Sequence, residues 1–112
     1  MAAYTELFID QGTTFNAVIN LNDDQSTAPI DLTGYIIRSQ MRRSYYSVNP
    51  SATFTCTITD AATGELTLSL TDTQTSAIKA GRYLFDVEIQ DTAKVVTRVL
   101  EGIITVTPGV TR

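Results

Sequence analysis

The side chains that most often perform catalysis are scarce in this chain. Its 112 residues contain no histidine and a single cysteine, Cys56. Nucleophilic sites of the Ser-His or Cys-His type need an imidazole whose pKa lies near neutrality, and histidine is the commonest metal ligand. Cys56 alternates with Phe54 and Ile58, which predicts a small buried hydrophobic residue rather than a reactive thiol. We therefore expect that the chain is not an enzyme and holds no cofactor.

Paired carboxylates are the remaining means of acid–base chemistry. Asp86 and Glu88 are two residues apart in a strand pattern, so both point to the outer face of the sheet. General acid–base catalysis needs a cleft that shifts the pKa, and a flat sheet face does not provide one. The pattern favours ion pairs with Arg98 on the neighbouring strand.

A polar segment offers oxygen atoms that could bind calcium. Asn20, Asn22, Asp23 and Asp24 follow one another closely, but their spacing does not match an EF-hand loop and no closing Glu is present. The segment is rich in turn formers, so we expect a solvated turn and no metal.

The strongest candidate for a contact with a partner is a cluster of arginines and tyrosines. It comprises Arg38, Arg42, Arg43, Tyr45 and Tyr46. These residue types are enriched at interface hot spots because they combine a large area with directed hydrogen bonds. The alternative is an exposed strand end with a tyrosine corner that covers the core. Nucleic acid is a less favoured partner, since the net charge is −4.

The elements that must position these residues are β-strands. Apolar and polar residues alternate along most of the chain, which places one face of each strand in a core and the other in water. Such segments joined by tight turns predict an all-β, immunoglobulin-like antiparallel β-sandwich of about seven strands with one short helix, in a single domain spanning 1–112. The predicted strands are 4–9, 14–21, 35–43, 52–59, 65–71, 82–90 and 95–107, with a helix at 72–79 and a bulge at Gly102.

No stretch of the sequence is long and apolar enough to span a bilayer, and the N-terminus lacks the pattern of a secretory signal. We expect no membrane partner and no small-molecule substrate. The chain is expected to stay in the cytoplasm or to leave the cell inside a larger particle.

Several short motifs occur in an order that resembles a known group of proteins. They are the segment at 9–15, Pro-Ile-Asp-Leu-Thr-Gly at 29–34, Gly-Glu-Leu at 64–66, Gly-Arg-Tyr at 81–83 and the ending at 98–112. The ordered set resembles small immunoglobulin-like domains of tailed-bacteriophage virion proteins, among them the N-terminal domains of baseplate upper proteins. It is still more similar to small structural proteins of cyanobacterial contractile-tailed phages (cyanophages). The resemblance implies a non-enzymatic virion component and transfers no functional residue.

The resulting expectation is a multi-copy adaptor or filler at the tail, baseplate or neck, located in the virion and binding other virion proteins. A capsid decoration protein, a carbohydrate-binding module and a cytoplasmic scaffold remain alternatives. Exposed strand edges invite strand addition, so we predict that residues 1–9 or 108–112 cross to an adjacent subunit. The tail residues concerned are Val110, Thr111 and Arg112.

Overall fold

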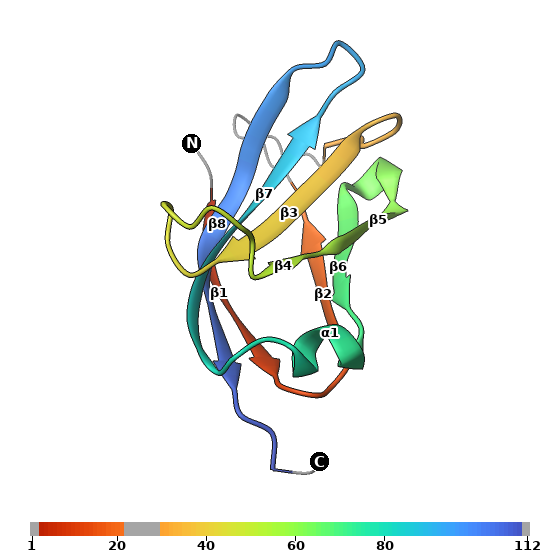
Figure 1. Cartoon of the computed structure of the whole chain (residues 1–112). Helices are drawn as coiled ribbons and strands as arrows, with labels where there is room; N and C mark the ends of the chain where they lie inside the picture. Colours follow the sequence, from red (N-terminus) through yellow and green to blue (C-terminus); the bar gives the residue numbers. More distant parts are fainter. Residues whose placement is uncertain (1–2, 22–29, 111–112) are drawn as a thin grey trace.

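The chain folds into two β-sheets that face each other across an apolar core (Figure 1). The computed structural model describes residues 3–21 and 30–110. The strands of the described part are β1 (Ala3–Asp10), β2 (Phe15–Asn20), β3 (Ile36–Arg42), β4 (Ala52–Thr53), β5 (Thr55–Asp60), β6 (Glu65–Leu70), β7 (Gly81–Gln90) and β8 (Val96–Thr107). A 3₁₀ turn, η1 (Ala61–Thr63), and a short helix, α1 (Asp72–Ser76), complete the elements. No helix in these residues is long and apolar enough to cross a membrane.

The order of strands identifies the fold. One sheet has the order β1-β8-β7-β3-β4 and the other the order β2-β6-β5. The larger sheet contains the last two strands, β7 and β8, next to β3, and it packs on a sheet of three strands. Immunoglobulin domains have this arrangement. The predicted all-β, immunoglobulin-like sandwich is confirmed.

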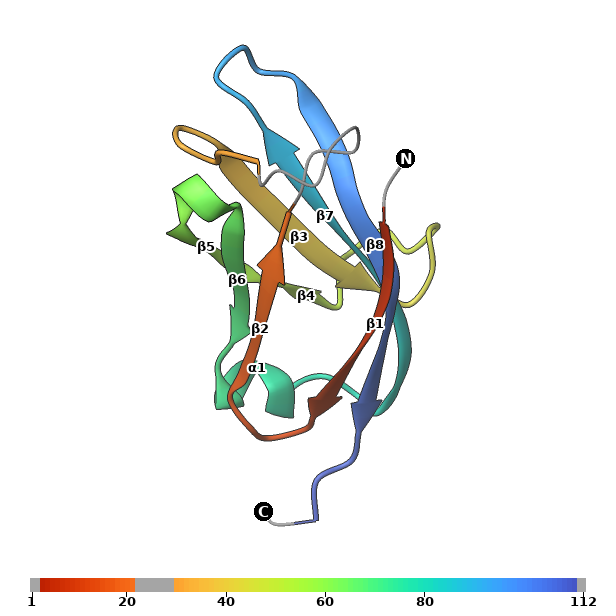
Figure 2. The same ribbon diagram turned by 180° about the vertical axis from the view of Figure 1, so that it is seen from behind.

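The first strand departs from the antiparallel pattern. β1 pairs in parallel with β8, from Ala3 opposite Leu100 to Asp10 opposite Thr107. β1 and β2 follow each other in sequence but belong to different sheets, so they do not form a hairpin. Figures 1 and 2 both show β1 beside β8 at the edge of the larger sheet. Ala3–Ile9 pair with β8 of their own chain. The expectation that residues 1–9 or 108–112 cross to an adjacent subunit stays a prediction, and residues 1–2 lie outside the described part.

The predicted strand at 52–59 divides into two, which raises the strand count from seven to eight among the described residues. The division falls at Phe54, whose amide donates a hydrogen bond of 3.0 Å to the carbonyl oxygen of Ser39. The Phe54 ring turns into the core, and its centroid lies 5.9 Å from that of Phe15. The chain thereby leaves the five-stranded sheet after β4 and enters the three-stranded sheet as β5. The alternation of apolar and polar residues does not reveal such a crossing, because it continues with the same two-residue period through β4 and β5.

The core consists of the inward faces of both sheets. The alternation predicted for β3, β5, β6 and β7 is confirmed, since their inward side chains are buried or packed against the buried ones. The buried set is Ile9, Phe15, Leu21, Leu32, Met41, Phe54, Leu66, Leu68, Leu70, Ile78, Tyr83, Phe85, Val87, Ile89, Leu100, Ile104 and Val106. Two buried polar side chains are satisfied: the Ser39 hydroxyl donates to the carbonyl of Asp86 at 2.6 Å and the Thr75 hydroxyl donates to that of Thr13 at 2.8 Å.

Helix α1 is shorter than predicted and ends at Ser76. Thr71 and Gln74 form a reciprocal capping box that starts it, as each side chain accepts a hydrogen bond from the other residue's amide. Ile78 lies beyond the helix and is buried under the sandwich. The Tyr83 hydroxyl, at the start of β7, donates a 2.6 Å hydrogen bond to the carbonyl oxygen of Lys79. This is the tyrosine corner of immunoglobulin-like domains.

Replacing Tyr83 by phenylalanine should lower the free energy of unfolding by about 1.5 kcal/mol, because the carbonyl of Lys79 loses its partner while the ring stays buried. Urea denaturation measures the loss. Tyr46→Phe is the matched control, since its ring is exposed and it should leave stability unchanged. Equal stabilities of the two variants would show that the hydrogen bond of the tyrosine corner does not stabilise the fold.

The irregularity in β8 does not lie at the predicted position. The pairing runs from Val87 opposite Leu100 to Glu88 opposite Arg98, so Val99 is the extra residue of the bulge. Gly102 keeps regular register opposite Phe85. A methyl group at Gly102 would overlap the carbonyl oxygen of Thr5. Gly102 therefore permits the close approach of β1 rather than a bulge.

Candidate partner-binding surface

The outer face of the five-stranded sheet gathers side chains from elements far apart in the sequence. The register places outward residues of β1, β8, β7 and β3 in rows across the strands. One row is Tyr4, Glu101, Asp86 and Gln40; the next is Glu6, Ile103, Leu84 and Arg42; the third is Phe8, Thr105 and Arg82. The face thus combines charged groups with aromatic and aliphatic ones. Tyr4 and Phe8 on β1 remain 60% and 64% exposed.

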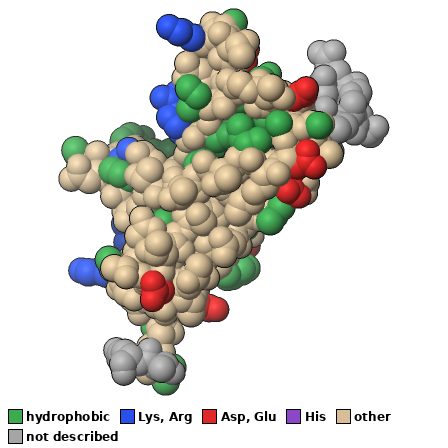
Figure 3. Space-filling view, turned by 90° about the vertical axis from the view of Figure 1, so that its right-hand side faces the viewer, with side chains coloured by type: hydrophobic (Ala, Val, Ile, Leu, Met, Phe, Trp, Pro, Cys, Tyr) green, Lys and Arg blue, Asp and Glu red, His purple; other side chains and the backbone are tan. Residues whose placement is uncertain are grey.

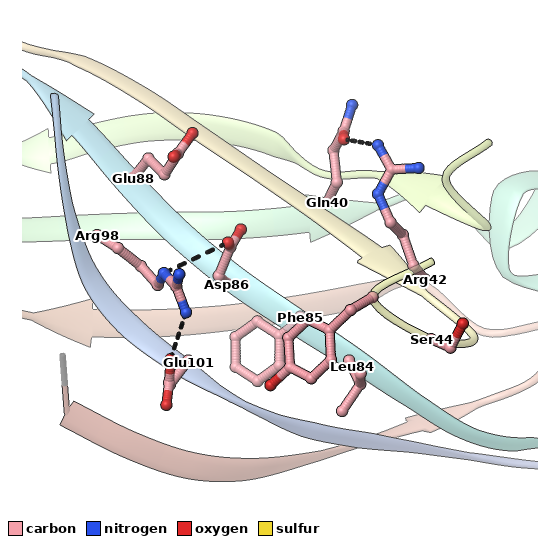
Figure 4. Close-up of a pocket in the computed structure, with 10 residues that line it drawn as sticks. Gln40, Arg42, Ser44, Leu84, Phe85, Asp86, Glu88, Arg98 and Glu101 are labelled. Atoms are coloured by element: carbon pink, nitrogen blue, oxygen red, sulfur yellow. Dashed lines mark hydrogen bonds and ion pairs between the residues drawn. The ribbon is translucent and has the colours of Figure 1, made fainter. Parts of the chain in front are cut away.

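The bulge at Val99 creates a charged cluster on this face. Residues three apart in a regular strand point to opposite faces, but the extra residue brings Arg98 and Glu101 to the same side. The Arg98 Nη1 donates to Glu101 Oε2 at 2.6 Å, and its Nε lies 3.8 Å from Asp86 Oδ2 (Figure 4). The predicted pairing of Arg98 with Asp86 is confirmed, whereas no ion pair joins Arg98 to Glu88, which lies opposite it in register. The hydrogen bond to Glu101 raises the pKa of Arg98.

The environment of Asp86 disfavours its charge. Partial burial, together with the neighbouring Glu88, raises the pKa of Asp86 above its ordinary value of 3.8, and Arg98 opposes the rise. The folded chain therefore holds this proton more tightly than the unfolded chain. The charged Asp86 carboxylate therefore destabilises the fold. This destabilisation is absent at pH values below the pKa of Asp86 in the unfolded chain and fully present above its pKa in the folded chain.

Asp86→Asn is accordingly expected to be neutral at pH 3 and to stabilise the fold at pH 7. The gain should stay below about 1 kcal/mol, because the site is partly exposed and the attraction to Arg98 is lost. Urea denaturation at the two pH values measures the difference. A variant that is less stable than the parent at pH 7 would show that the ion pair outweighs the burial of the carboxylate.

A shallow hollow of about 300 Å³ lies on this face, between the Tyr45 loop and the outward side chains of β3, β7 and β8. Figure 4 shows Arg98, Asp86 and Glu101 on one side of it and Gln40 with Arg42 on the other. Its polar groups can exchange hydrogen bonds with a ligand or with side chains of a partner. Nowhere in the described part of the chain do three His, Cys, Asp or Glu residues gather as metal ligands.

The predicted arginine–tyrosine cluster does not form a single patch. Arg42 holds the loop that follows β3: its Nη1 donates to the carbonyls of Ser47 and Val48 at 3.0 and 3.2 Å. Arg38 lies near the start of β3, where its Nη2 donates to Gln90 Oε1 at 3.3 Å.

Arg43 lies just after Arg42, the last residue of β3, and takes a different role. Its guanidinium carbon lies 4.7 Å from the centroid of the Tyr83 ring, a cation–π contact that covers the tyrosine corner, and its nitrogens approach Gly81. Arg43 therefore supports the fold and is separate from the outer face.

Tyr45 and Tyr46 do not cover the core. Their side chains are 74% and 93% exposed, so the interpretation of this segment as a tyrosine corner is wrong. The tyrosine corner is formed by Tyr83 instead. Tyr45 borders the hollow and remains available to a partner. Val110 is 91% exposed in the tail, which leaves the body of the sandwich beyond β8 (Figure 1). Thr111 and Arg112 lie outside the described residues.

Sequence reasoning missed Tyr4 and Phe8. The signal was present, because Tyr4, Glu6 and Phe8 alternate with Leu7 and Ile9. Their exposure follows from the position of β1 at a sheet edge, which alternation does not disclose. Figure 3 views the molecule from the right-hand side of Figure 1 and shows mainly tan backbone and uncharged polar atoms, with acidic, basic and hydrophobic side chains distributed among them.

Two other candidate sites from the sequence, Cys56 and the polar segment that begins at Asn20, gain no support from the structure. Burial raises the pKa of the Cys56 thiol, which reduces its reactivity at neutral pH, and the side chain is half-buried against the core. Asn20 ends β2, whereas Asn22, Asp23 and Asp24 of the polar segment lie outside the described residues.

Comparisons with known proteins support the fold alone. No protein-family model matches the chain, and no curated protein matches it. Among solved structures, the internalin-like protein lmo2027 of Listeria monocytogenes is 20% identical, with a TM-score of 0.51 over 95% of this chain. This chain spans 28% of that protein. A structure from a study of cell-adhesive interactions of VGSC beta subunits is 10% identical, with a TM-score of 0.49 over 93% of this chain and 92% of its own.

Proposed function

We propose that this chain is a non-enzymatic protein-binding module and, more specifically, a multi-copy structural component of a tailed-bacteriophage particle. The observation that carries the binding role is the outer face of the five-stranded sheet, where Tyr4, Phe8 and Tyr45 are each more than half exposed beside paired charges. The ordered motifs of the sequence support the phage particle as its location, at the tail, baseplate or neck.

The exposed aromatic area fits a macromolecular partner. An aromatic side chain carries roughly 200 Å², so these three present roughly 400 Å² to solvent. One partner of a standard protein interface contributes about 800 Å². The aromatic groups would thus supply about half of such an interface, and the surrounding charges would supply its polar rim.

Mass spectrometry of purified particles from the virus that encodes the chain tests this proposal. The protein should be present at many copies per particle, and immuno-gold labelling should place it on the tail, baseplate or neck. Labelling of the shell would identify a capsid decoration protein instead. Absence from particles, with abundance in the infected-cell lysate, would contradict the proposal.

A carbohydrate-binding role is the second candidate, because the Tyr45 ring borders a hollow that also carries Gln40 and Asp86. Amide and carboxylate groups bind vicinal hydroxyls, and an aromatic ring can cover a sugar face. A glycan array with the parent chain and Tyr45→Ala decides this: binding that the substitution abolishes supports the carbohydrate role.

A further inference from the structure

We infer that β1 is the site at which two copies of this chain join, through antiparallel pairing of β1 with its own copy. The inference goes beyond the proposed function, because it identifies a partner and does not depend on where the protein works. It rests on the backbone groups at the edge, the residues on each face of the strand and the register that they permit.

β1 is the most accessible edge of the described sheets. It pairs only with β8, and its eight residues make it longer than the other edge strands. β4 has two residues, and β5 carries a register irregularity near Asp60, a feature that blunts an edge. β2 is regular but has six residues and lacks exposed aromatic side chains.

The backbone of β1 divides its hydrogen-bonding groups between its two sides. The amide of Gln11 donates to the carbonyl of Thr107 at 2.9 Å, and the carbonyl of Ile9 accepts from the Thr107 hydroxyl at 3.4 Å. Backbone groups of successive strand residues point to opposite sides. The odd-numbered residues therefore face β8, and the groups of Glu6 and Phe8 face the free edge.

Registers centred near the middle of β1 keep most of these groups paired, and one of them does so without placing like charges directly opposite each other. Residues directly opposite in an antiparallel pair share a face, so the pair must match outward residues with outward ones. A register centred on Glu6 places two copies of Glu6 opposite each other, and one centred on Phe8 places Glu6 opposite Asp10. Both juxtapose carboxylates, which is destabilising.

The register centred on Leu7 avoids this conflict. It places Glu6 opposite Phe8 and Tyr4 opposite Asp10, where the phenol can donate to the carboxylate. The backbone groups of Tyr4, Glu6 and Phe8 face the free edge, whereas the Asp10 carbonyl already accepts from the amide and hydroxyl of Thr13. About six hydrogen bonds can therefore form in the pattern that an antiparallel ladder requires. On the inner face, Leu7 meets its own copy on the two-fold axis.

The same register covers the exposed aromatic side chains. The two Phe8 rings lie on either side of the axis as diagonal neighbours, within reach of each other. Each loses part of the 64% exposure that it has in the single chain. The pairing joins the two five-stranded sheets into one continuous sheet and removes an unprotected edge from each copy.

Sedimentation velocity over a series of concentrations tests the inference on the full chain. The mass should rise from 12.2 kDa toward twice that value. Phe8→Glu places a carboxylate opposite Glu6 of the second copy and should weaken the dimer by about tenfold or more. The double variant Phe8→Glu/Glu6→Lys should restore the dimer, because each new glutamate then faces a lysine.

Val18→Glu is the control, since Val18 is 60% exposed on β2 and the substitution adds the same charge. It should dimerise as the parent does. Amide hydrogen exchange reads the register: Glu6 and Phe8 should gain protection as the dimer forms. A chain that stays monomeric, a dimer indifferent to Phe8→Glu, a double variant that fails to recover, or unchanged exchange at these two amides would each overturn the inference.

Discussion

Replacing Gly102 by alanine should cost about 3 kcal/mol or more of folding free energy, or abolish cooperative folding. The added methyl group would overlap the carbonyl oxygen of Thr5, and it would also press on the Phe85 ring. Backbone cannot yield as a flexible side chain can, because Thr5 is held within the β1–β8 ladder. The chain must therefore either strain β8 or release β1. Urea denaturation measures the loss.

A neighbouring substitution separates this effect from a general weakness of β8. Thr105→Ala also lies on β8 but points outward, and it should change stability by less than about 1 kcal/mol. If release of β1 is the response, hydrogen exchange will accelerate at the amides of Thr5, Leu7 and Ile9 in the Gly102 variant. Equal stability of the two variants would show that β1 can shift without cost.

Replacing Leu68 by alanine should lower the free energy of unfolding by about 4 kcal/mol. Leu68 is fully buried at the middle of β6, the central strand of the smaller sheet. Its neighbours in register are Ala17 and Cys56, whose side chains are too short to fill the space that the substitution would leave. The cavity should therefore persist, and its cost should fall in the upper part of the range for such substitutions.

Leu84→Ala removes the same atoms from the outer face of β7, where the side chain is half-buried beside Ile103. Water can fill the vacated space there, so the loss should be about 1 kcal/mol. Thermal or urea denaturation of both variants measures the two losses. Similar values for the two leucines would contradict the assignment of Leu68 to the centre of the core.

The side chains that form the interior of this protein could be predicted individually from its sequence. The alternation around Phe85 and Val87 predicted which side chains are buried, and it placed Asp86 on the face where it meets Arg98. Gly64 has a φ of 71°, a left-handed conformation that glycine adopts without strain in a turn. These features depend on the two-residue period of a strand and on glycine's lack of a side chain, both of which are local.

The side chains that form the candidate partner-binding surface could not be predicted in the same way. Arg42 and Arg43 are adjacent in the sequence, yet one braces a loop and the other covers the Tyr83 ring. Tyr4 and Phe8 form part of the exposed face because β1 lies at an edge, which depends on the partner that β1 selects. No local pattern specifies that partner.

The amino-acid sequence by itself determined that the chain forms strands, which of their faces are apolar, and that histidine chemistry is excluded. The tertiary structure alone decided that β1 runs parallel to β8, that Phe54 divides a strand between two sheets, and that Gly102 serves a close approach. The physical reason is the range of the forces involved. Side-chain alternation acts over two residues, whereas strand pairing and backbone overlap join residues such as Thr5 and Gly102 that meet only after the chain has folded.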